Sequence, residues 1–114
     1  MKKTPDSPIA TIRETSASQN DKGHFVVSGT LGFDTAPGLM KQASRLFTPF
    51  KSVVVDFSGV DNCNSAGLAV VLEIVKQMRQ QNKSVCFQSL PEQICTFARA
   101  YSIEKEFSQL DLLC

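Results

Sequence analysis

The chain lacks most of the features that point directly to a chemistry. Its 114 residues include no tryptophan, one tyrosine and one histidine, His24. The four cysteines form no C-x-x-C pair, so their spacing predicts no zinc site, and reduced thiols are expected at Cys63, Cys86, Cys95 and Cys114. No stretch approaches the roughly 18 apolar residues that span a bilayer. No apolar segment follows the two N-terminal lysines, as a secretory signal requires.

A block of like charge is also absent. Twelve basic and eleven acidic residues leave a formal net charge of +1, and both signs are scattered along the chain. Nucleic-acid backbones and anionic membranes attract concentrated positive charge, so the sequence predicts neither a nucleic-acid partner nor direct membrane insertion. With 42% hydrophobic and 20% charged residues, the composition is that of one ordinary globular domain. We expect a cytoplasmic protein.

The periodicity of apolar residues predicts an α/β fold. A flexible leader over residues 1–8 should precede a single domain over 9–114. The expected elements are strands Ile9–Glu14 and His24–Leu31, a helix between Ala36 and Phe47 capped by Asp34 or Thr35, a strand Ser52–Phe57, a helix Ser65–Gln81, a strand Ser84–Ser89, and a helix opened by Pro91. The first two strands should pair as an antiparallel hairpin. Whether residues 104–114 end as strand or helix stays open, so the sheet is expected to be mixed, with four or five strands and helices packed against it.

The stretch from Val53 to Gln80 organises the rest of the chain. The run Val53–Val55 is typical of a strand that is covered on both faces. Ser58-Gly59 and Asp61-Asn62 predict a turn before the next helix. In an open α/β sheet, the loop that leaves the carboxyl end of a strand is the usual place for recognition, which directs attention to the segment that begins at Asn64.

Catalytic interpretations of this segment fail because the residues that would have to assist Ser65 are missing. The chain has no phosphate-cradling G-x-x-x-x-G-K-[ST] loop, and Ser65 lacks the preceding glycine of G-x-S-x-G. The only histidine lies in a predicted strand, where a structural imidazole is expected rather than a general base. A Ser65 nucleophile is the one enzymatic alternative. The sequence therefore predicts a protein that is not an enzyme and that has no catalytic residue, no metal site and no cofactor.

A binding role fits the same residues better. Ser65 stands at the start of a helix, where it or Asn64 serves as N-cap. The small residues Ser65, Ala66 and Gly67 are expected to leave the backbone open to a partner. The predicted partner-binding set is Asn64, Ser65, Ala66, Gly67 and Leu68. A phosphate on Ser65 would add about −1.5 to −2 charges there, which the helix dipole tolerates.

The segment Asp56–Leu68 carries the pattern D-x-S-x-V-x-x-x-x-S-A-G-L and resembles the STAS domain, shared by sulfate transporters and anti-sigma factor antagonists. The resemblance covers roughly Phe25 to Phe107, including SGTL at Ser28–Leu31. It implies a single STAS-like domain that is not an enzyme and that docks on a partner protein through the loop and helix N-terminus around Ser65.

Two members of that family suggest different partners. SAGLAVVLE and QNKSVCFQSLPEQICTFARAYSI are similar to the small STAS accessory subunit of an Mla-type phospholipid ABC transporter. This likeness implies binding to the transporter's ATPase subunit, support of outer-membrane lipid asymmetry, and a place beside the inner membrane through that partner. The alternative is an anti-sigma factor antagonist, whose kinase partner phosphorylates the residue matching Ser65. The family usually has an aspartate where this chain has Asn64, so docking on the ATPase is the first interpretation.

Overall fold

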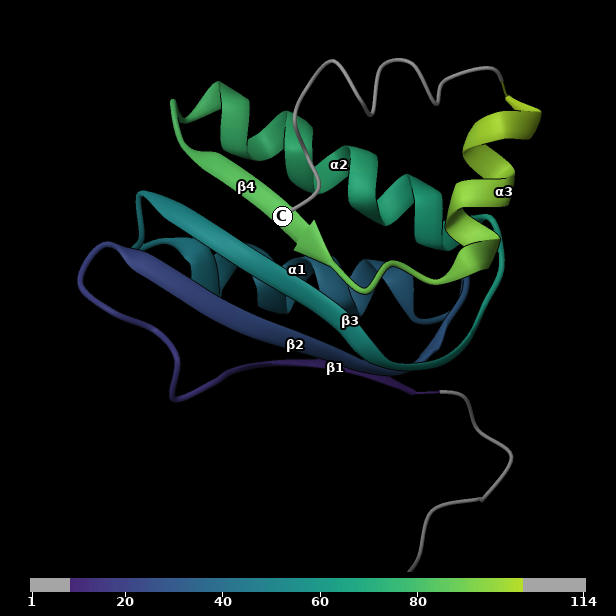
Figure 1. Cartoon of the computed structure of the whole chain (residues 1–114), viewed down its shortest axis with the longest axis horizontal. Coiled ribbons are helices and arrows are strands. Elements are labelled where there is room, and N and C mark those ends of the chain that lie inside the picture. The colour runs from purple at the N-terminus through teal and green to yellow at the C-terminus, as the bar shows by residue number, and fades with distance from the viewer. Residues whose placement is uncertain (1–8, 102–114) are drawn as a thin grey trace, which may run out of the picture.

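A computed structural model describes residues 9–101. In chain order its elements are β1 Ala10–Glu14, β2 Lys22–Leu31, α1 Ala36–Phe47, β3 Ser52–Cys63, α2 Ala66–Gln80, β4 Ser84–Gln88 and α3 Glu92–Ala100 (Figure 1). The predicted order of strands and helices is confirmed over this range. The predicted leader, 1–8, and the terminal element, 104–114, lie outside the described residues.

The four strands of the described residues form one mixed sheet in the order β1-β2-β3-β4. β1 and β2 pair antiparallel, as the predicted hairpin requires, and β2, β3 and β4 run parallel. Because these three strands point the same way, their carboxyl ends share one edge of the sheet, here called the carboxyl edge. The β2–α1 loop, the β3–α2 connection and the β4–α3 loop all leave from it.

α1 and α2 pack against the same face of the sheet. α1 contacts β1, α2 contacts β4, and the two helices contact each other. Alternate residues of β3, Val53, Val55 and Phe57, are almost fully buried in that core. Phe25 meets Phe47 of α1 there, with ring centroids 4.9 Å apart in an edge-to-face arrangement. Figure 1 shows α3 at the end of the molecule where the carboxyl edge lies.

The run Val53–Val55 is buried throughout, which confirms a strand covered on both faces. The turn predicted at Ser58-Gly59 and Asp61-Asn62 is wrong, because β3 continues to Cys63. β2 pairs with it along that length, and two register shifts absorb the irregularity. A methyl group on Gly59 would overlap the Ser28 hydroxyl, so this glycine marks a close approach of two strands at a bulge.

Two predicted helix faces are displaced at single residues. The helical spacing of Leu68, Val71 and Leu72 predicts that Leu72 is buried in α2. It is 39% exposed, whereas Val70 and Ile74 are buried. Each helical residue turns by about 100°, so a buried face that includes Val71, Ile74 and Met78 leaves Leu72 at its margin. The spacing of Ile94, Phe97 and Tyr101 likewise predicts one apolar stripe on α3. Tyr101 is 59% exposed because the helix ends at Ala100.

The expectation of reduced cysteines is confirmed for Cys63 and Cys95, which are free thiols. It is wrong for Cys86, which is disulfide-bonded, since spacing along a sequence does not reveal which thiols a fold brings together. Within residues 9–101, no cluster of three or more His, Cys, Asp or Glu side chains could hold a metal ion. No helix in the described part of the chain is long and apolar enough to cross a membrane.

Candidate partner-binding site

The start of α2 is held by Asn64. Its side-chain oxygen accepts the Ala66 N–H at 2.8 Å, and its carbonyl accepts the Gly67 N–H at 2.9 Å. Its own N–H donates to the carbonyl of Leu31 at 3.1 Å, which fastens this turn to the end of β2. Ser65 makes no capping hydrogen bond. Of the two residues predicted as cap, Asn64 therefore does the capping, and the Ala66 and Gly67 N–H groups have partners within the chain.

The predicted partner-binding residues divide into an outer and an inner group. Asn64 is exposed and Ser65 is half-buried. Ala66, Gly67 and Leu68 are buried, so the expectation that this whole stretch is open to a partner is wrong for these three residues.

The inner group is buried because α3 packs against the start of α2. A methyl group on Gly67 would lie 3.2 Å from Ile94 Cδ1 and 3.5 Å from Cys63 Cβ. Gly67 is therefore small to admit a neighbouring helix of the same domain. Asn64 and Ser65 remain as the members of the predicted set that a partner can reach.

The β2–α1 loop lies beside them. The Thr35 hydroxyl accepts the Gly32 N–H at 3.0 Å and lies 2.9 Å from the Thr30 carbonyl, to which it can donate. Thr35 occupies the N-cap position of α1 as predicted, but its side chain makes no capping bond to the helix and instead holds the loop. A methyl group on Gly32 would lie 3.3 Å from Asn64 Nδ2. The two connections thus form one continuous surface.

Sequence reasoning missed three exposed residues on that surface. Phe33 is 67% exposed at the tip of the β2–α1 loop, and Asp34 follows it into solvent. Asp61, near the end of β3, is also exposed and accepts a hydrogen bond from the Thr30 hydroxyl at 3.3 Å. Phe33 interrupts the polar sequence between β2 and α1, and this was the available signal. We call Phe33, Asp34, Asp61, Asn64 and Ser65 the tip surface.

A Ser65–histidine catalytic pair does not form in this fold. His24 pairs with Val54 near the start of β3, whereas Ser65 follows the end of that strand at Cys63. Nine residues of strand separate the two positions, or about 30 Å at 3.3 Å per residue. A general base must come within hydrogen-bond reach of the nucleophile it activates, so this histidine cannot serve Ser65.

Cys63 lies directly before the tip surface and is 9% exposed. Burial raises the pKa of its thiol, because the thiolate is less well solvated there. This cysteine therefore behaves as a small apolar residue between the sheet and the start of α2.

The Asn64 cap gives a stability prediction. Replacing Asn64 by alanine removes the acceptor of the Ala66 N–H and should lower the free energy of unfolding by about 1 kcal/mol. Asn64→Asp keeps an oxygen at that place and adds a negative charge near the positive end of the helix dipole, so its stability should equal or exceed that of the original chain. Urea denaturation measures both variants. Equal stability of the alanine variant and the original chain would mean that the cap contributes nothing.

Comparison with known proteins agrees with this architecture. A family model described as "Mlab, STAS domain" matches residues 15–113. Because this match covers most of the chain, the chain belongs to the STAS domain family. A search of curated protein sequences finds no match.

Solved structures of anti-sigma factor antagonists share the fold. One from Mycobacterium paratuberculosis is similar with a TM-score of 0.63 and 19% identity, covering 90% of this chain and 85% of that one. The phosphorylated form of SpoIIAA, a cell fate determinant of Bacillus, has a TM-score of 0.61 and 8% identity, covering 82% of this chain and 86% of that one. The TM-scores establish a common fold, and at identities this low the likeness extends to the fold alone.

Proposed function

We propose that the protein is a non-catalytic interaction module that binds a partner protein through the tip surface. The observation that carries the proposal is the β3–α2 connection of a STAS domain. There the Asn64 side chain accepts the Ala66 N–H at the helix start, and the Ser65 side chain makes no capping hydrogen bond. A half-exposed residue with no capping bond is free to serve recognition.

The first candidate partner is the ATPase subunit of an Mla-type phospholipid ABC transporter, which this domain would bind as an accessory subunit that supports outer-membrane lipid asymmetry. Two observations support it: the likeness of SAGLAVVLE and the following segment to that subunit, and the description of the family model that matches the chain. In this role the domain sits beside the membrane through its partner.

The second candidate is an anti-sigma factor antagonist whose partner kinase phosphorylates Ser65. The solved structures support it, since the similar chains include anti-sigma factor antagonists and one of them is the phosphorylated form of its protein. The geometry at Ser65 supports it too. Because the helix cap comes from Asn64, a phosphate on Ser65 would break no capping bond, and negative charge at a helix N-terminus is favourable.

Affinity purification of the tagged chain from its own cells, followed by mass spectrometry, separates the two candidates. The transporter role predicts recovery of an ABC ATPase, and recovery of only a kinase-like anti-sigma factor would reject it. For the second role, incubation with that kinase and ATP should add one phosphate to Ser65, and none to a Ser65→Ala variant. If purified preparations of both proteins fail to bind the chain, the interaction-module proposal itself is wrong.

A further inference from the structure

Among residues 9–101, the most exposed large apolar side chain lies on the tip surface. Phe33 is 67% exposed, although a phenylalanine that stays in water forgoes roughly 1.5–3 kcal/mol of burial. The loop that carries it is fixed by the Thr35 hydroxyl and lies against Asn64. An aromatic ring on a rigid support is the kind of residue that supplies most of the binding energy at protein interfaces.

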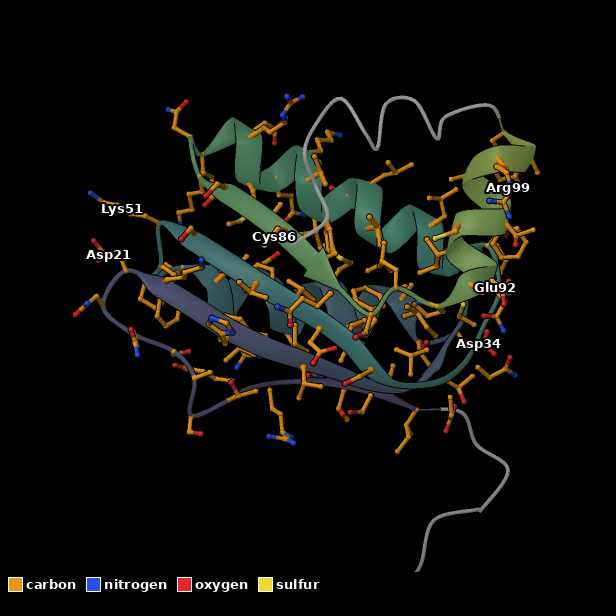
Figure 2. The ribbon with its side chains drawn as sticks, in the orientation of Figure 1. Asp21, Asp34, Lys51, Cys86, Glu92 and Arg99 are labelled. Atoms are coloured by element: carbon orange, nitrogen blue, oxygen red, sulfur yellow. The ribbon has the colours of Figure 1, made fainter. Side chains whose placement is uncertain are left out.

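The charged residues in the connections around Phe33 are acidic. Asp34, Asp61 and Glu92 are exposed in the connections at the carboxyl edge, and residues 32–35, 58–65 and 89–92 contain no lysine or arginine. The opposite edge is basic on balance, because Lys22, Lys51 and Lys83 lie at the amino ends of the three parallel strands, with Asp21 among them. Figure 2 shows Asp34 and Glu92 at one end of the molecule, where Arg99 of α3 also lies, and Lys51 beside Asp21 at the other end.

From these observations we infer that Phe33 is the anchor of the interface, and that its partner presents an apolar pocket rimmed by arginine or lysine. The inference rests on the proposed function and deepens it, because it names the chemistry that the partner must offer. The ring fills the pocket and fixes the lifetime of the complex. The carboxylates of Asp34 and Asp61 attract the basic rim and raise the rate of association.

A second copy of this chain fits the tip surface less well. Two tip surfaces facing each other would bring like charges together, which opposes association. The basic edge of another copy has the right charge but offers a hollow lined mainly by polar residues: Ala17, Gln19, Asn20, Asp21, Lys22, His24 and Ser52. Such a hollow gives a phenyl ring little apolar surface to bury.

The test uses the full chain and whichever purified partner, ABC ATPase or anti-sigma kinase, binds it, with rates measured by surface plasmon resonance. Phe33→Ser should weaken the affinity about 10–100-fold, mostly through faster dissociation. Tyr101→Ser removes an aromatic ring of similar exposure, 59%, at the far end of α3, and should leave the affinity unchanged. Because both side chains are largely in water, neither change should unfold the domain.

The charge component has its own readout. The double variant Asp34→Asn, Asp61→Asn should slow association about 3–10-fold at low salt and flatten its dependence on ionic strength. If Phe33→Ser binds with unchanged affinity while a separate Ser65→Arg variant fails to bind, Phe33 is not the anchor. The proposed function, binding through the tip surface, would then still stand. A higher association rate for this double variant would show that the partner's pocket is not rimmed by basic residues. Concentration-dependent self-association lost in Phe33→Ser would assign the pocket to a second copy and overturn the inference.

Discussion

Replacing Gly29 by alanine should lower the free energy of unfolding by about 2–4 kcal/mol. Two separate costs add at this residue. Its φ of +101° is one that residues with a Cβ rarely adopt, and a methyl group there would overlap the carbonyl oxygen of Ile9, which directly precedes β1. The clash is with backbone, so no side-chain rotation relieves it. Chemical denaturation measures the loss.

Gly38→Ala is the matched control for that experiment. Gly38 lies in α1, and a methyl group there has nothing within 4 Å. The same substitution should therefore stabilise the domain by about 0.5–1 kcal/mol, because alanine favours a helix over glycine. A loss of similar size in both variants would show that the cost at Gly29 does not come from its backbone conformation or its contact with Ile9.

Gly29 also bears on the tip surface. It pairs with Ala10 of β1 and stands where the register between β2 and β3 shifts. The next residues, Thr30 to Gly32, supply the carbonyl and N–H that the Thr35 hydroxyl holds. Strain at Gly29 should therefore reach the loop that presents Phe33, even though the two residues do not share an element.

The elements could be predicted because each depends on local periodicity. The helical spacing from Ala36 to Phe47 and the β-branched run Val53–Val55 each have one solution for burying their apolar residues. The fold class followed from their order. The end of β3 could not be predicted, because Ser58-Gly59 has the composition of a turn. Only pairing with β2, a contact between residues about thirty positions apart, extends the strand through it.

The position of the site could be predicted from the sequence, but the exposure of its individual residues could not. The helix start at Asn64-Ser65 follows from capping preferences and from the STAS resemblance. Which residues face out depends on where α3 packs, and the sequence does not give the distance between Gly67 and Ile94. Gly67, one of the small residues that suggested an open surface, instead leaves room for that contact. The exposure of Phe33 likewise depends on how the β2–α1 loop closes.

Ser65→Arg should reduce the affinity for the partner by at least about 100-fold while leaving the fold intact. Ser65 makes no capping bond, so the substitution removes no interaction that holds α2, and its half-exposed position lets the arginine side chain reach solvent. In the complex the same side chain enters a closely packed contact. It also faces the basic rim inferred above, where like charges add repulsion to the steric cost.

The affinity of Ser65→Arg is to be compared with that of two other variants. Ser65→Ala keeps the residue small and should bind within about threefold of the original chain if size is what matters at this position, since a surface truncation away from a binding hot spot costs little. Ser84→Arg places the same charge on an exposed serine at the amino end of β4, at the opposite edge of the sheet, and should bind normally. Isothermal titration calorimetry gives the affinities, and the unfolding transition of each variant shows that it is folded. Normal binding by Ser65→Arg would place the interface away from the start of α2, and equal losses in the two arginine variants would attribute the effect to added charge rather than to the site.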